Sequence, residues 1–151
     1  MESDAAPRKP VPVPDSRSEG FWAAAVRHVL AIQQCAACGA HAYPPVDLCR
    51  HCLSSARSFR FEPASGRGRV KTWTVMRQAF LPGFAPDVPY IVAEVVLDDP
   101  DGVRMIGQII GAAPDALSLG TPVHVVFDDV APGVAVPQFA LADSSRQGES
   151  T

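Results

Sequence analysis

Four cysteines are the residues of this sequence whose type and spacing can do chemistry. They form two C-x-x-C pairs, Cys35 with Cys38 and Cys49 with Cys52, and ten residues separate the pairs. Each pair can hold one side of a tetrahedral metal, and zinc is the ion that best matches four thiolates. A zinc ion with four protein ligands has no open coordination position. We therefore expect the cysteines to stabilise the chain rather than to catalyse a reaction.

Two other uses of the cysteines fit the sequence less well. Disulfides would need an oxidising compartment, and a redox dithiol would need a C-x-x-C that opens a helix in a βαβ pattern. His41 and His51 lie near the pairs, but four thiols complete the site without them. Reduced cysteines, with no signal peptide and no apolar run of membrane length, predict a cytoplasmic protein.

No other group of residues has the composition of a catalytic site. Acyl transfer or hydrolysis needs a nucleophile, a base and a group that orients the base. The four histidines lack such neighbours, and Glu94 lies in an apolar strand where an arginine partner or an outward orientation is expected. We therefore expect no catalytic residues on this chain.

The elements that must position the cysteines are a helix and a small ribbon within residues 20–62. Apolar residues at helical spacing predict a helix over residues 21–32, with Trp22, Val26, Val29 and Leu30 on one face. This face either packs against the chain's own ribbon or docks onto another subunit. An exposed Phe-Trp pair is typical of an interface, so Phe21, Trp22 and Val26 are candidate partner contacts.

After the ribbon the pattern changes to a period of two. Strands are predicted at 69–77, 90–97, 103–110, 123–128 and 136–142, with a helical turn at 115–119. Five strands with a helical turn between the third and the fourth are typical of an OB-fold barrel. The expected organisation is therefore mainly β: a flexible Pro-rich tail (1–19), helix and zinc ribbon (20–62), OB-fold barrel (63–142) and polar tail (143–151).

One predicted loop, between residues 78 and 89, is more apolar than a solvated loop. Phe80 and Phe84 lie in it among leucine and prolines. An exposed apolar loop favours contact with another molecule. Phe80 and Phe84 are therefore added to the candidate partner contacts.

An ordered set of short motifs resembles a known family. It consists of Phe21-Trp22, Leu30 to Cys35 before Cys35-x-x-Cys38-Gly39, Tyr43-Pro44-Pro45 before Cys49-x-x-Cys52, Ser65-Gly66-Arg67-Gly68, Thr72-Trp73-Thr74-Val75, Pro89 to Ala93, and Leu119-Gly120. Over residues 20–142 the chain resembles the acyl-CoA-associated proteins that join a helix and a rubredoxin-like zinc ribbon to an OB-fold, known as domain of unknown function thirty-five.

The resemblance implies an accessory subunit rather than an independent enzyme. Such proteins bind thiolase-fold enzymes, including thiolases and lipid-transfer-protein-like retro-aldolases of steroid side-chain breakdown. Others are joined to MaoC-type enoyl-CoA hydratases. The expected partner is a separate thiolase-fold subunit, with a hydratase complex as the alternative.

The basic residues suggest one ligand. Between residues 50 and 77 seven arginines and lysines face a single acid, Glu62. Arginine forks match phosphate oxygens, and the resemblance makes coenzyme A the candidate, with Arg67, Arg69 and Lys71 as its contacts. These charges equally fit solvated strands or an acidic partner surface. A nucleic-acid-binding OB module is a further alternative, which the net charge of −3 disfavours.

Overall fold

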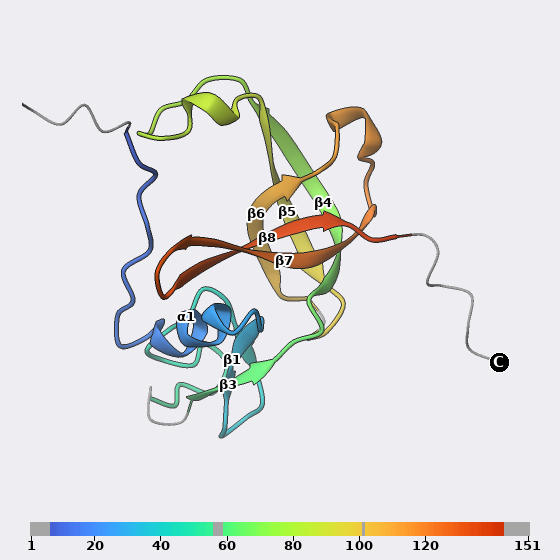
Figure 1. The fold of residues 1–151 in the computed structure, drawn as a ribbon. Coiled ribbons are helices and arrows are strands. Elements are labelled where there is room, and N and C mark those ends of the chain that lie inside the picture. Colours follow the sequence, from blue (N-terminus) through green and yellow to red (C-terminus); the bar gives the residue numbers. More distant parts are fainter. Residues whose placement is uncertain (1–6, 56–58, 101, 144–151) are drawn as a thin grey trace, which may run out of the picture.

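The computed structural model describes residues 7–55, 59–100 and 102–143, so the outer parts of both tails, Arg57 and Asp101 lie outside it. The elements in chain order are α1 (Glu19–Val26), β1 (Ala31–Cys35), β2 (His41–Ala42), β3 (Phe59–Pro63), β4 (Arg67–Met76), η2 (Ala85–Asp87), β5 (Tyr90–Leu97), β6 (Arg104–Ile110), η3 (Pro114–Ala116), β7 (Pro122–Ala131) and β8 (Val134–Leu141). Figure 1 shows α1 and the ribbon at one end of the barrel. No helix in the described ranges is long and apolar enough to cross a membrane.

The ribbon is a three-stranded antiparallel sheet with the order β2-β1-β3. Strand β3 runs along the whole of β1, from Cys35 opposite Phe59 to Ala31 opposite Pro63. Phe59 and Phe61, which alternate with Arg60 and Glu62, therefore belong to the sheet of the ribbon. The central strand β1 is almost entirely buried, which explains its lack of alternation.

The barrel confirms the predicted OB-fold. Its strands close in the order β4-β5-β6-β8-β7, with β4 pairing both β5 and β7. β6 and β8 are parallel, and the 3-10 helix η3 lies between β6 and β7. The clearest strand is β5, in which every second residue is buried, as the alternation of a sheet with one covered face requires.

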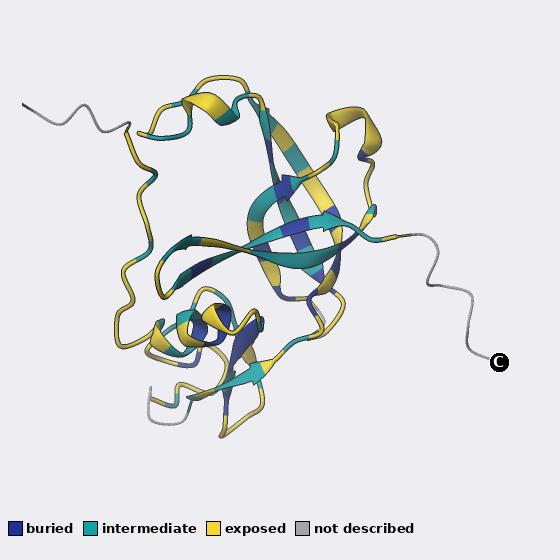
Figure 2. Cartoon of the chain, viewed as in Figure 1, coloured by how far each residue is buried: buried dark blue, intermediate teal, exposed yellow. Residues whose placement is uncertain are grey.

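Ribbon and barrel share one hydrophobic core. Phe21, Leu30 and Ile32 belong to the same buried cluster as Val95 and Phe139 of the barrel. Figure 2 shows the buried residues continuing from α1 and β1 to the barrel strands. The small ribbon therefore gains apolar contacts from the barrel that it could not supply itself.

The predicted helix over residues 21–32 is wrong in its length and in its buried face. Helix α1 ends at Val26, and its buried residues are Phe21, Ala24 and Ala25. The cause is a Schellman motif: His28 has a φ of 57°, the His28 N–H donates to Ala25 O at 2.8 Å, and the Val29 N–H donates to Ala24 O at 3.0 Å. Leu30 is still buried, but it follows the helix.

His28 also joins the helix to the barrel. Its ring lies parallel to that of Phe127, with 5.4 Å between centroids, and its Nε2 is 2.9 Å from Asp129 Oδ1. Both partners are on β7, so the end of α1 is fixed against the barrel by a polar and a stacking contact.

The N-terminal segment 7–14 runs beside the barrel, from the loop that carries η2 to the start of α1 (Figure 1). Lys9 forms an ion pair with Asp87, and its Nζ lies 5.0 Å from the centroid of the Phe84 ring. Phe84 in turn packs on Tyr90 with 5.7 Å between centroids. The expected Pro-rich tail therefore contacts the apolar loop.

Gly66, before β4, should not tolerate a side chain. Its φ is +75°, and a Cβ there would collide with Val125 of β7, next to the seam where β4 closes the barrel. We expect Gly66→Ala to lower the free energy of unfolding by roughly 2–4 kcal/mol, through a strained backbone and overpacking. Gly133→Ala is the matched control, because Gly133 has a φ of +70° but open space around it. Equal losses in urea denaturation would show that the contact with Val125 is unimportant.

Candidate metal centre and its surroundings

The four cysteines come together at one end of the ribbon. Their sulfur atoms all lie within 4.8 Å of one another, with 3.7 Å between Cys35 and Cys52 and 3.6 Å between Cys38 and Cys49. In a regular tetrahedron with zinc–sulfur bonds of about 2.3 Å, the sulfurs are about 3.8 Å apart. The donor set and its dimensions therefore fit a structural zinc ion, and neither histidine near the pairs belongs to the cluster.

Two similar turns place the sulfurs. The Gly39 N–H donates to Cys35 O at 2.7 Å, and the Leu53 N–H donates to Cys49 O at 2.9 Å. The residue after each pair has a positive φ, 78° at Gly39 and 64° at Leu53. Glycine adopts this conformation without steric cost, whereas Leu53 adopts it with a side chain.

The negative charges that four neighbouring thiolates would carry favour a bound cation. Hydrogen bonding with the Ser54 side chain and then with its backbone lowers the pKa of Cys52 to about 6. The Ala40 backbone favours a thiolate on Cys38, but desolvation and the three neighbouring sulfurs outweigh it and raise the pKa of Cys38 to about 12. Four adjacent thiolates need a compensating positive charge, which a bound zinc ion would supply.

Ser54 should strengthen metal binding through Cys52, from which its Oγ is 3.1 Å. Because the hydroxyl stabilises the thiolate, Ser54→Ala should raise the pKa of Cys52 and weaken zinc affinity by roughly 10-fold to 100-fold. Ser54→Thr keeps the hydroxyl and should retain the affinity. Competition with a chromophoric chelator at pH 7 measures both. Equal affinities for the two variants would contradict the role of the hydroxyl.

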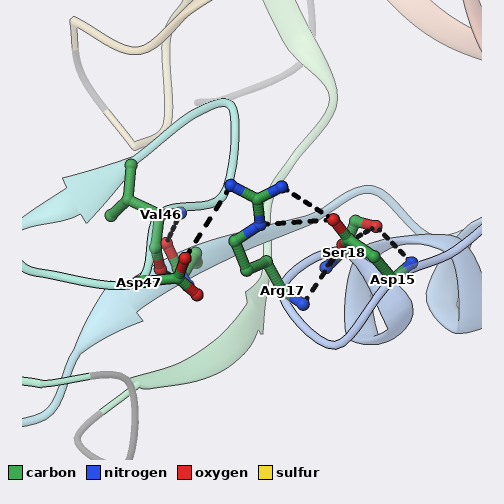
Figure 3. A network of polar contacts seen from close by, with 6 residues as sticks. Asp15, Arg17, Ser18, Val46 and Asp47 are labelled. Carbon is green, nitrogen blue, oxygen red and sulfur yellow. Dashed lines mark hydrogen bonds and ion pairs between the residues drawn. The ribbon is translucent and has the colours of Figure 1, made fainter.

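Two polar clamps hold the segment between the cysteine pairs (Figure 3). The side chain of Gln33, which is buried on β1, accepts from Val46 N at 2.8 Å and donates to Val46 O at 3.0 Å. Arg17 forms two ion pairs: its Nη2 is 2.9 Å from Asp15 Oδ2, and its Nη1 is 3.8 Å from Asp47 Oδ2. Ser18 and then Arg17 hold the pKa of Asp15 well below its usual range. Side-chain contacts thus hold the segment between the cysteine pairs against β1 and the start of α1.

The expected coenzyme A contacts lie on the first half of β4. Arg67, Arg69 and Lys71 are exposed, alternating with buried Gly68 and Val70. Arg69 is engaged within the chain, with its Nη1 at 3.3 Å from Gly120 O and its Nε at 4.0 Å from Asp98 Oδ1. The three side chains share the exposed face of β4, and they line neither the pocket beside Cys49 nor the pocket between the start of β5 and the end of β6.

The expected partner contacts have different exposures. Phe21 is only 4% exposed and packs on Trp22 and Tyr43, so its ring is part of the chain's own core and offers little surface to a partner. Trp22 is half-buried and Val26 is exposed on α1. In the apolar loop Phe80 is 75% exposed, whereas Phe84 is half-buried beneath Lys9.

Several exposed apolar side chains were not predicted. They are Leu48 and Leu53 beside the cysteine pairs, Ile106 on β6 and Leu119 before β7. Leu53 could have been found, because it stands where the first pair has Gly39. Ile106 alternates with buried Met105 like any outward residue, so its sequence context gave no signal.

Fold and site define the class: a zinc-ribbon protein with an OB-fold barrel. Comparison with known families agrees. Residues 22–56 match the ChsH2 rubredoxin-like zinc ribbon domain, and residues 61–128 match the ChsH2 C-terminal OB-fold domain. A "DUF35 domain-containing scaffold protein" of Methanocaldococcus jannaschii is 32% identical, over 67% of this chain and 69% of that protein. The chain belongs to the ChsH2/DUF35 family.

Other relatives are named as parts of enzymes. A "Probable enoyl-CoA hydratase alpha subunit" of Thermomonospora curvata is 35% identical over 84% of this chain, and a "3-oxo-4,17-pregnadiene-20-carboxyl-CoA hydratase alpha subunit" of Mycobacterium tuberculosis is 33% identical over 72%. The chain spans 38% and 33% of their lengths. A solved chain of the "Ltp2-ChsH2(DUF35) aldolase" is 32% identical, with a TM-score of 0.77, over 87% of this chain and 99% of that one.

Proposed function

We propose that this protein is a non-catalytic accessory subunit that binds and supports a thiolase-fold acyl-CoA enzyme, either a thiolase or a retro-aldolase of lipid or steroid side chains. One observation carries the proposal: the similarity to the solved aldolase chain extends over 99% of that chain. The chain thus has the elements of a subunit that occurs in an aldolase complex. Zinc held by four reduced thiolates fits a cytoplasmic location.

The exposed apolar residues support a protein partner. Trp22 and Val26 on α1 and Phe80 with Leu81 in the loop give apolar surface that the described part of the chain leaves at least partly exposed. Figure 1 places α1 and this loop at opposite ends of the barrel, so a partner that contacts both must extend along it. The ion pair between Lys9 and Asp87 holds the loop beside the segment 7–14 that connects the two ends.

A hydratase complex is the second candidate function. It is favoured by the two relatives named as hydratase alpha subunits. The chain matches about a third of each relative, so the activity named for the whole relative is proposed here for a complex and not for this chain alone. The third alternative, a nucleic-acid-binding module, has only the basic residues of β4 in its favour.

Affinity purification from the native host separates these functions. We expect a thiolase-fold protein to co-purify in a stoichiometric complex. A hydratase instead of a thiolase-fold protein would support the second candidate, and nucleic acid without either protein would overturn both.

The same purified complex tests whether the apolar loop contacts the partner. Phe80→Ser combined with Leu81→Ser should raise the dissociation constant of the complex at least tenfold, as expected for the loss of buried apolar anchors. Leu119→Ser is the control, because Leu119 is 77% exposed but lies before β7, outside the loop. Unchanged affinity in the double variant would show that the loop does not contact the partner.

A further inference from the structure

The Pro-rich segment before α1 is docked on the barrel. Residues 8–14 run from the loop 78–89 to the start of α1 (Figure 1). We propose that these residues form a strap that fixes the loop 78–89 in the conformation that presents Phe80 and Leu81 to a protein partner. The inference rests on the proposed function only for the identity of that partner.

Lys9 makes the contacts at the loop end of the strap. Its ammonium group forms an ion pair with Asp87 in η2, and its Nζ lies 5.0 Å from the centroid of the Phe84 ring. The Lys9 and Asp87 side chains are each 34% exposed, so water and salt screen the ion pair only in part. Phe84 packs on Tyr90 at the start of β5, which connects Lys9 through the loop to the sheet of the barrel.

Asp87 depends on Lys9 to balance its charge. The Oδ2 atom of Asp87 is buried, and apart from the Lys9 ammonium group no donor in the described residues reaches it. A buried carboxylate oxygen without a compensating partner is costly. Departure of the strap would therefore destabilise the loop conformation that places Asp87 at this position.

Gly83 lets the strap approach the loop closely. Its φ is +80°, and a Cβ at this position would collide with the backbone of Arg8 and of Lys9. Glycine thus serves both the conformation of the loop and its distance from the strap. Such a backbone contact distinguishes a docked segment from a tail that touches the loop with one flexible side chain.

The other end of the strap is fixed at the start of α1. The carboxylate of Asp15 accepts from Ser18 N at 2.8 Å and from Ser18 Oγ at 2.6 Å. Arg17 pairs with Asp15 and with Asp47, which lies between the two cysteine pairs. The strap therefore extends from the metal-binding ribbon to the loop at the far end of the barrel.

The middle of the strap is exposed and stiff. Val11 and Val13 are 42% and 85% exposed, so burial of apolar surface does not hold it in place. Pro10, Pro12 and Pro14 favour the extended polyproline II conformation, which advances about 3.1 Å per residue. A stiff segment loses little conformational freedom when it docks, so the few contacts at Lys9 are enough to position it.

The exposed side chains of the loop indicate what the strap does. Phe80 is 75% and Leu81 is 58% exposed, whereas the strap contacts Gly83, Phe84 and Asp87. The strap thus leaves the apolar tip of the loop uncovered, which is the opposite of what an inhibitory segment would do. A loop that is already fixed loses less conformational entropy on binding, so the strap should strengthen the complex.

Hydrogen exchange measured by NMR on the zinc-loaded full chain tests the strap without a partner. Lys9→Asp should accelerate exchange of the amides in residues 83–88 about threefold to tenfold, because repulsion replaces an ion pair and the cation–π contact is lost. Lys9→Asp combined with Asp87→Lys restores opposite charges and should bring the rates back to within about twofold of the original. Arg8→Gln is the control, because Arg8 forms no ion pair with a described carboxylate.

Gly83→Ala displaces the strap by steric contact and should accelerate exchange in the same amides. Gly120→Ala is its control, because Gly120 has a φ of +85° but open space around it. The amides of β5 should stay protected in every variant. Unchanged exchange of residues 83–88 in both Lys9→Asp and Gly83→Ala, or a charge-swapped double variant that exchanges as fast as Lys9→Asp, would overturn the strap.

The affinity for the partner tests the second half of the proposal. Lys9→Asp should raise the dissociation constant of the complex at least threefold, and the charge-swapped double variant should restore it. An unchanged or lower dissociation constant for Lys9→Asp, together with faster exchange in the loop, would refute the role of the strap in binding. The absence of a thiolase-fold partner, together with the expected exchange rates, would refute the proposed function alone.

Discussion

Cys38→Ser and Cys49→Ser are each expected to abolish zinc binding and unfold the ribbon. Each removes one of the four ligands of a closed tetrahedral site, and the three remaining sulfurs cannot complete it. Structural zinc sites contribute roughly 10–16 kcal/mol of apparent binding energy, which equals or exceeds the total stability of a typical domain of about 5–15 kcal/mol. The ribbon's own sheet cannot replace this energy, because the sheet is small and β2 has only two residues.

The loss should extend into the barrel. Leu30 and Ile32 of the ribbon belong to the same buried cluster as the barrel core, so unfolding the ribbon exposes apolar surface on the barrel as well. We therefore expect a lower melting temperature for the whole chain and no complex with the partner. A chain whose barrel melts at its original temperature would show that the two parts are energetically independent.

Zinc content and circular dichroism measure this prediction, with His51→Ala as the control. His51 lies between two ligands in the sequence but outside the cluster of sulfur atoms. The control should therefore keep one zinc ion per chain and its secondary structure. Full zinc content in either cysteine variant would contradict the assignment of these residues as ligands.

The parts of the fold that the sequence predicted correctly are those with strong local signals. Two C-x-x-C pairs have few structural uses, and the alternation in β5 with the turn after it defines a hairpin within one short segment. An OB-fold barrel was expected from the count of strands and the resemblance, but the parallel pairing of β6 with β8 was not, because pairing between distant strands leaves little trace in sequence.

The end of the helix was mispredicted for a physical reason. Val29 and Leu30 continue the helical spacing, but His28 adopts a left-handed backbone conformation that ends the helix. Tertiary contacts of the His28 ring stabilise this conformation. Its ring is held by Phe127 and Asp129, about a hundred residues away in the chain. A spacing pattern cannot contain that information.

A pocket of about 640 Å³ between the ribbon and the turn that joins β5 to β6 escaped prediction for the same reason. Its basic residues come from β2, the second cysteine pair and β6, so they form a group only after the ribbon has docked on the barrel. The run of basic residues around β4 looked more significant because its members are neighbours in sequence. On a strand, however, alternate side chains point to the same face, so the basic residues of β4 form an exposed row and do not enclose a pocket.

Phe21→Ala is expected to lower the free energy of unfolding by roughly 3–5 kcal/mol. The ring is 4% exposed and contacts Trp22 edge-on at 5.0 Å between centroids and Tyr43 at 5.6 Å. Its removal leaves a cavity at the point where α1, the ribbon and the barrel meet. Urea denaturation should show a lower midpoint in a single transition, because the cavity weakens a core that both parts share.

Val26→Ser is the matched comparison on the same helix. Val26 is 44% exposed, and surface substitutions of this kind change stability by about 0.5 kcal/mol or less. If Val26 contacts the partner as proposed, Val26→Ser should weaken the complex and leave the urea midpoint of unfolding unchanged. Phe21→Ala should lower the midpoint, and the variant that remains folded should bind the partner with unchanged affinity. A Phe21→Ala variant with unchanged stability and a weakened complex would return Phe21 to the interface, where its position beside Trp22 first suggested it.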